Sequence, residues 1–149
     1  MLLGIGSMVP IAAQTSEPTA APVSHFRILP GLRLCGPEIV SASATAAFRE
    51  TPGWKGGEFW IAKLEAGLAG GRVAFGRAFT SDVGLGAEAN AFVLRTWGNP
   101  WGVRPNGTYA GLEVSLILLA RVSAGVMYRS NNGSGGSRWA ATWGLGIGL

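Results

Sequence analysis

The residues whose types could support chemistry are mostly charged, and they recur on one side of segments in which every second residue is apolar. The set comprises Lys63, Glu65, Arg72, Glu88, Asn90, Glu113, Arg121 and Arg129. A period of two is typical of a β-strand, so all of them would share the face opposite the apolar one. Charges that face a low-dielectric interior are costly unless they pair. We therefore expect a mixed-sign network inside a small barrel, with ordinary solvation for any members at the barrel mouths.

Few residues could carry catalysis. A Ser–His–acid triad needs a histidine that accepts the serine proton, and the only histidine, His25, lies beside a linker. Glu65 and Glu88 could serve as an acid–base pair, but a buried ion pair is the simpler interpretation. Cys35 is the single cysteine, which excludes an intramolecular disulfide, and no cluster of metal ligands accompanies it. We expect no catalytic residues, no cofactor and no metal.

The elements that must position these side chains are clearest at the C-terminus. In residues 138–149, bulky apolar residues alternate with glycine, alanine and threonine, which indicates a strand. Further alternating segments cover residues 26–34, 40–48, 60–68, 73–79, 83–94, 112–118 and 122–129. Residues 60–68 and 110–120 also fit a helical spacing, but their flanking glycines favour strands. The Gly70-Gly71 pair predicts a tight hairpin turn with positive φ angles.

Composition predicts where the apolar faces point. Charged residues make up only 13% of the chain, well below the roughly 25–35% typical of a soluble surface. A face of Gly, Ala, Ser and Thr has few groups that water solvates well, but its small side chains fit the narrow interior of a β-barrel. A barrel of about eight strands leaves no open channel. The net charge of +4 comes from scattered residues, so we expect no nucleic-acid partner.

The predicted fold is therefore all-β: an antiparallel up-and-down β-barrel of about eight strands with a lipid-facing exterior. A closed barrel satisfies its backbone hydrogen bonds within lipid, and strands of about 9–11 residues cross a bilayer. Arg77 interrupts the apolar face of residues 73–79, and its long side chain could reach a membrane surface.

Aromatic residues gather near the expected strand ends, as in the girdles of membrane barrels. The predicted girdle consists of Trp60, Trp97, Trp101, Tyr109, Tyr128, Trp139 and Trp143. The other interpretation is that these rings form the core of a soluble sandwich.

Together, the alternation, the aromatic positions and the terminal WGLGIGL of residues 143–149 resemble small bacterial outer-membrane β-barrel proteins of the eight-stranded type. The resemblance covers about residues 26–149 and rests on a pattern, with no specific motif. The last strand of that family usually ends on Phe or another aromatic residue, whereas this chain ends on Leu149. The resemblance implies a location in the bacterial outer membrane and contact with membrane lipid. Some members are lipid-modifying enzymes that depend on a histidine, and this chain has only His25, in or beside the linker, with no Ser–His pair expected on a barrel strand.

Three regions are predicted along the chain. Residues 1–13 are apolar and resemble a signal peptide that lacks the basic start. Residues 14–25 have the composition of a flexible linker, and residues 26–149 form the barrel.

We expect a structural or surface-interaction role without an open pore or catalysis. A surface ligand or protein would bind the loops at residues 49–57, 97–108 and 131–137, which carry Trp54, Trp97, Trp101 and Asn131-Asn132. One alternative is a soluble secreted barrel that binds a hydrophobic ligand in a cavity lined by Trp60, Leu85, Leu116, Trp143 and Ile147. Another is a lipid-modifying outer-membrane enzyme, which needs a perturbed carboxylate in an accessible cleft.

Overall fold

The computed structural model describes residues 25–49, 56–130 and 138–148. These residues form eight strands: β1 (His25–Gly36), β2 (Ile39–Arg49), β3 (Gly57–Gly67), β4 (Gly70–Thr80), β5 (Gly86–Thr96), β6 (Thr108–Ile117), β7 (Arg121–Arg129) and β8 (Trp139–Ile147). β1 therefore begins on the last residue of the predicted linker. The predicted signal peptide at residues 1–13, the linker residues 14–24, Trp54 and the segment 131–137 lie outside the described residues. No helix in the described ranges is long and apolar enough to cross a membrane.

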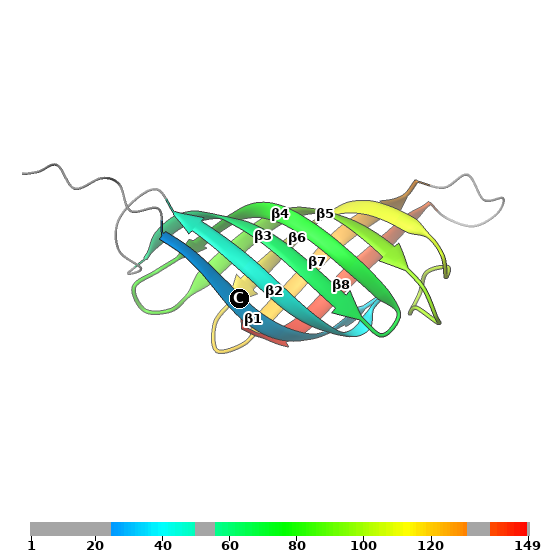
Figure 1. Ribbon diagram of the computed structural model, residues 1–149, viewed down its shortest axis with the longest axis horizontal. Coiled ribbons are helices and arrows are strands. Elements are labelled where there is room, and N and C mark those ends of the chain that lie inside the picture. Colours follow the sequence, from blue (N-terminus) through cyan, green and yellow to red (C-terminus); the bar gives the residue numbers. More distant parts are fainter. Residues whose placement is uncertain (1–24, 50–55, 131–137, 149) are drawn as a thin grey trace, which may run out of the picture.

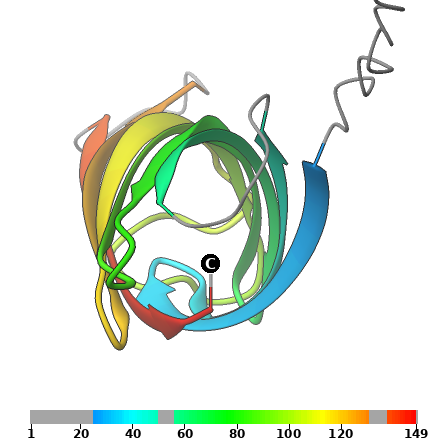
Figure 2. The ribbon, with the colours of Figure 1, turned by 90° about the vertical axis from the view of Figure 1, so that its left-hand side faces the viewer.

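The strands close into one antiparallel barrel, seen from the side in Figure 1 and from one end in Figure 2. Each strand pairs with the next along the chain, and β8 pairs with β1 from Leu32↔Ile147 to Gly36↔Trp143. The predicted fold class, an all-β, antiparallel up-and-down barrel of about eight strands, is confirmed.

The first half of β1 pairs with β2 alone, because the β8 ladder begins only at Leu32. Pro30 lies in this half, opposite Ala44 of β2. Proline has no backbone N–H to donate, so it is tolerated where one side of a strand has no partner. Pro30 therefore fits the half of β1 that has a partner on one side only.

The two ends of the barrel differ in the segments that they carry. The terminal end holds the start of β1, the end of β8 and the connections 81–85 and 118–120; it is on the left in Figure 1. The loop end, on the right, holds the turn at Pro37 and Glu38, the turn at Leu68 and Ala69, the longer connection 97–107, the end of β7 and the start of β8. Of the predicted interaction loops, residues 97–107 lie at the loop end, whereas the strand ends Arg49 and Gly57 lie at the terminal end; residues 50–55, between those two strand ends, lie outside the described residues.

One predicted turn and the start of one predicted strand are shifted in the structure. Gly70 and Gly71 belong to β4, where they pair with Thr96 and Arg95, and neither has a positive φ. The turn is instead at residues 68–69, and the small size of Gly71 lets the ring of Trp97 lie against it. The alternation predicted from residue 83 also begins too early, since residues 81–85 form a turn before β5.

The outer surface of the barrel is apolar on every strand, from Phe26 in β1 to Ile147 in β8. In β4, for example, the side chains of Val73, Phe75 and Phe79 are exposed, and the residues between them, except Arg77, face the interior. The residues that a soluble ligand carrier would turn inward are all on the outside, 41–63% exposed: Trp60, Leu85, Leu116, Trp143 and Ile147. The cavity predicted by that alternative is therefore not formed by these residues.

Candidate functional site

All eight side chains of the predicted polar network are buried, and none is more than 8% exposed: Lys63, Glu65, Arg72, Glu88, Asn90, Glu113, Arg121 and Arg129. They come from β3, β4, β5, β6 and β7, always from the strand positions opposite the exposed apolar residues. The period of two in each strand thus directs them to one shared interior.

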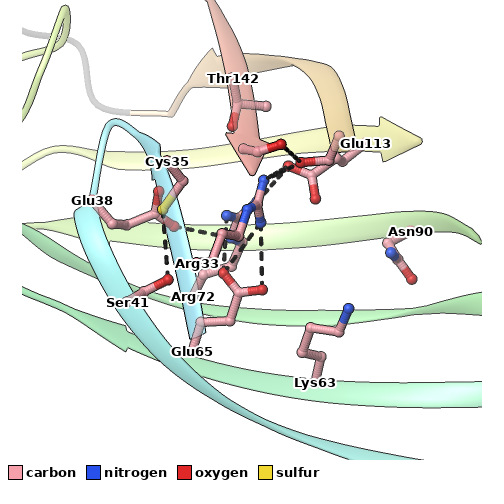
Figure 3. A network of polar contacts seen from close by, with 12 residues as sticks. Arg33, Cys35, Glu38, Ser41, Lys63, Glu65, Arg72, Asn90, Glu113 and Thr142 are labelled. Carbon is pink, nitrogen blue, oxygen red and sulfur yellow. Dashed lines mark hydrogen bonds and ion pairs between the residues drawn. The ribbon is translucent and has the colours of Figure 1, made fainter. Parts of the chain in front are cut away.

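The centre of the interior is a ring of two arginines and two glutamates that alternate in charge (Figure 3). Arg33 Nη1 lies 3.3 Å from Glu65 Oε2, and Arg33 Nη2 forms an ion pair with Glu113. Arg72 Nη2 lies 3.0 Å from Glu65, and Arg72 Nη1 lies 2.9 Å from Glu113. The ring therefore joins β1, β3, β4 and β6 across the barrel, and each carboxylate contacts two guanidinium groups.

A third carboxylate, Glu38, reaches the ring from the turn between β1 and β2. Its Oε1 lies 2.9 Å from Arg72 Nε, and its side chain is fully buried. The turn is seen in cyan within the ring of strands in Figure 2. It is held there because Ala69 N donates to Glu38 O at 3.3 Å and Trp101 N donates to Pro37 O at 3.2 Å.

A second group of charges adjoins the ring toward the terminal end. Glu88 accepts from Lys63 Nζ at 3.1 Å and from Asn90 Nδ2 at 3.2 Å, and it also pairs with Arg121. Arg121 Nη2 lies 3.9 Å from Glu113, which links this group to the ring. Each charged side chain of the ring and of this second group is therefore held by at least one opposite charge.

These ion pairs are balanced in number, with four acids and four bases: Glu38, Glu65, Glu88 and Glu113 against Arg33, Lys63, Arg72 and Arg121. Such balance matters because an uncompensated charge in a buried site costs several kcal/mol, on the order of 3–5 when one partner is lost. The interior thus holds a mixed-sign network of ion pairs. Arg129 stands apart from this group, at the loop end where β7 finishes.

The glycines of β8 give the ring its space. A Cβ placed on Gly144 would lie 2.0 Å from Arg33 Nε and 2.5 Å from Nη2. The small residues on the inward face of β8 therefore leave room for the guanidinium group of Arg33 in β1.

Apolar clusters fill the barrel on either side of the network. The cluster toward the terminal end consists of Ala47, Phe59, Ile61 and Ala78. The cluster toward the loop end consists of Ala74, Phe92, Leu94, Tyr109 and Met127. Along β3 and β5 the apolar residues of the two clusters lie on opposite sides of the polar ones, so the interior is layered apolar, charged, apolar.

The outer aromatic residues form a belt at each end. The loop-end belt consists of Trp97, Trp101, Tyr128, Trp139 and Trp143. The terminal-end belt consists of Phe26, Phe48, Trp60 and Phe79, of which the sequence analysis had identified only Trp60. Arg77 is exposed near the terminal end, 4.9 Å above the Trp60 ring, and pairs with Glu58 at 2.6 Å.

Tyr109 was wrongly assigned to the girdle. Its side chain is 3% exposed and packs in the interior, and its hydroxyl accepts a hydrogen bond from Arg104 N at 3.2 Å. The signal was present in the sequence, because Tyr109 shares strand parity with Glu113. Its position near a strand end favours an interfacial ring, but its parity directs the side chain to the interior.

Two members of the network were missed for related reasons. Arg33 shares parity with Cys35 and opposes the exposed Leu32 and Leu34, so alternation could have identified it. Glu38 had no such signal, because turn residues have no strand parity and a turn is usually solvated.

As to chemistry, each interior carboxylate is buried against a cation and is therefore poorly placed to take a proton from a substrate. Within the described ranges there is no group of three or more His, Cys, Asp or Glu residues that could bind a metal. The arrangement is suited to holding strands together across the interior. Comparisons with protein-family models, curated proteins and solved structures found no match to this chain.

Proposed function

We propose that this protein is a small outer-membrane β-barrel with a lipid-facing exterior, no open pore and a structural or surface-interaction role. The observation that carries the proposal is the inversion of polarity across the barrel wall. Large apolar side chains are exposed on every strand, and an ion-paired network lies inside. In water this arrangement would expose a continuous apolar surface, whereas in lipid it is the favourable one.

The dimensions of the barrel support the same proposal. The strands are 9–12 residues long, which matches the span of about 9–11 residues needed to cross a bilayer in tilted strands. Aromatic belts at both ends correspond to the two interfaces of a membrane, where such rings are enriched. Arg77 is placed to extend its charge toward the terminal-end interface while its stem covers Trp60.

The outer face also offers a recess that suits a lipid chain. An apolar groove of about 640 Å³ crosses β4 to β7, where the short side chains of Ala87, Ala89 and Ala124 lie between bulkier neighbours such as Phe79 and Leu116. An acyl chain would fill such a groove without a polar partner.

The proposal of a closed barrel rests on the filled interior. Apolar clusters flank a charge network that spans the barrel, and about eight strands leave a lumen only wide enough for side chains. We expect no measurable conductance above the bare bilayer when the protein is inserted in a planar membrane.

The test is to fractionate cells that express the full chain and to follow the protein by heat-modifiable gel migration. The proposal predicts that the protein is in the outer-membrane fraction, needs detergent to stay monodisperse, and migrates differently before and after boiling. A folded, monodisperse protein in detergent-free buffer would overturn it and would favour a soluble barrel. Stepwise conductance would overturn the closed-barrel part alone.

A further inference from the structure

The apolar groove on the outer face of the barrel has one charged end. Glu58 of β3 and Arg77 of β4 line the groove there. The other outward-facing side chains of its lining are all apolar, from Phe79 in β4 to Val122 and Ala124 in β7. The groove therefore has the polarity of an amphiphile, with a charged head region and an apolar body.

Strand register shows that the groove consists of two rows of paired residues. Neighbouring strands are about 4.8 Å apart, so a row that crosses from β4 to β7 covers about 14 Å. One row begins with Arg77, and the other begins with Glu58, which is opposite Phe79. The members of the rows are Arg77, Ala89, Val114 and Ala124, and Glu58, Phe79, Ala87, Leu116 and Val122.

The rows also run along the barrel, from the terminal end toward the loop end. Arg77 is near the terminal end of β4, beside the terminal-end belt. Continued past Ala124, the same row reaches Trp143 of β8, a member of the loop-end belt. The ring of Trp143 is 6.2 Å from the ring of Trp101, which lies in the connection between β5 and β6 at the loop end. A lipid with its headgroup at Arg77 would thus direct its chain toward the middle of the membrane.

The charged end of the groove is an ordered pair of opposite charges. Arg77 Nη2 lies 2.6 Å from Glu58 Oε2, and the Arg77 guanidinium lies 4.9 Å above the ring of Trp60. A guanidinium has five N–H donors and a carboxylate has about four acceptor positions, so this contact uses only part of each group. Both side chains remain more than half exposed, at 56% and 63%. A ligand can therefore contact both charges while their own pair stays intact.

The two charges together select among lipid headgroups. A headgroup with only a negative charge is attracted by Arg77 but repelled by Glu58 beside it. A headgroup that carries a phosphate and an ammonium group matches both, with the phosphate at Arg77 and the ammonium at Glu58. A primary ammonium donates up to three hydrogen bonds to a carboxylate, whereas a quaternary ammonium has no N–H to donate. Phosphoethanolamine therefore fits the pair better than phosphocholine or phosphoglycerol.

We propose that the groove binds one phosphatidylethanolamine molecule from the leaflet at the terminal end of the barrel. Its headgroup contacts the pair of Arg77 and Glu58, and an acyl chain fills the space above Ala87, Ala89 and Ala124. The proposal names the lipid class for this groove and rests on the proposed lipid-facing exterior. It adds a single site with a headgroup preference, whereas bulk lipid would cover the apolar surface without one.

The test is native mass spectrometry of the full chain folded in a neutral detergent. Phosphatidylethanolamine, phosphatidylcholine and phosphatidylglycerol with identical acyl chains are titrated separately. We expect one phosphatidylethanolamine per barrel at low lipid concentration. The other two lipids should bind at least about tenfold more weakly, because each lacks one of the charge-assisted contacts.

Three variants change the site in different ways. Glu58→Gln should reduce phosphatidylethanolamine binding to the level of phosphatidylcholine, because the carboxylate that accepts from the ammonium is lost. Arg77→Gln should weaken the binding of all three lipids, because each carries a phosphate. Ala89→Leu should do the same by filling the groove, and it leaves both charges in place.

Each change has a matched control outside the groove. Ala66→Leu adds the same bulk at an exposed position of β3, and Arg95→Gln removes the same charge from an exposed position of β5 near the loop end. Both controls should bind phosphatidylethanolamine as the wild type does. Heat-modifiable migration checks that every variant is folded, and Glu58→Gln and Ala89→Leu keep the test valid if Arg77→Gln does not fold.

The inference is overturned if the three lipids bind alike, or if Ala66→Leu loses as much lipid as Ala89→Leu. Fractionation and the need for detergent are established before the titration. A folded protein that is monodisperse without detergent contradicts the proposed function, whereas a detergent-requiring barrel without headgroup preference contradicts this inference alone.

Discussion

Replacing Glu113 with glutamine would remove one negative charge from the centre of the ring while nearly preserving the shape of the side chain. Glu113 Oε2 contacts both Arg33 and Arg72, and Oε1 lies 3.9 Å from Arg121. The substitution would leave the network with three acids against its four bases in a site where the carboxylate is 3% exposed. Glu65 would then be the one carboxylate of the ring left between the guanidinium groups of Arg33 and Arg72, and their mutual repulsion would be compensated only in part.

The size of the effect follows from the distances. A pair of unit charges separated by the 2.9 Å between Arg72 and Glu113 attracts by about 6 kcal/mol at an effective dielectric constant of about 20. Glutamine is also easier to desolvate than a carboxylate, which offsets part of this loss. We therefore expect Glu113→Gln to lower the free energy of unfolding by about 3–5 kcal/mol, the usual cost of breaking a buried ion pair.

The assay is urea unfolding of the full chain in lipid vesicles, followed by tryptophan fluorescence and by the fraction of heat-modifiable protein. The control is Glu58→Gln, the same chemical change in the exposed pair with Arg77, which should cost less than about 1 kcal/mol. The double variant Glu113→Gln with Arg33→Gln restores charge balance, so the two costs should be less than additive by at least about 0.5 kcal/mol. Equal costs for Glu113→Gln and Glu58→Gln would refute the reasoning.

Two further predictions concern the same interior. Lys63→Met and Glu88→Gln should each lower the free energy of unfolding by about 3 kcal/mol. In a double-mutant cycle, the double variant should lose less than the sum of the two single losses. Strict additivity would mean that the 3.1 Å contact between Lys63 and Glu88 contributes nothing. Gly144→Ala should lower the free energy of unfolding by about 1–3 kcal/mol in the same urea assay, because the added methyl group would displace the Arg33 guanidinium. An unchanged unfolding midpoint would show that Arg33 has room to move.

Much of the fold was predictable because one physical rule governs it. In a barrel with one apolar and one polar face, strand parity decides the environment of every side chain, so the alternation around Lys63 and Glu113 was sufficient to place both inside. The same rule would have placed Arg33 and Tyr109 correctly had it been applied to them. Strand ends were less certain, since Gly70 and Gly71 have a turn-like composition but lie in a ladder.

Other features depend on tertiary structure that alternation does not encode. Glu38 is buried because its turn is hydrogen-bonded to two other connections, which come from distant parts of the chain. The cavity of about 360 Å³ at the loop end, whose lining includes Val103, Tyr109 and Ala140, likewise requires β5, β6, β7 and β8 to be neighbours. The ring of charges also depends on tertiary structure. Strand parity directs its side chains to the interior but does not set their height along the barrel axis. Register and tilt decide which charges meet.

The central claim, that the apolar exterior faces lipid, is tested most directly by placing arginine on it. Leu112 lies in the middle of β6, opposite Ala91 and Val126, and is 63% exposed, whereas Leu119 is fully exposed in the turn between β6 and β7. In lipid vesicles, Leu112→Arg should lower the unfolding free energy by about 2–4 kcal/mol and Leu119→Arg by no more than about 1 kcal/mol. Equal costs within about 0.5 kcal/mol, as for two water-exposed sites, would contradict the lipid-facing barrel.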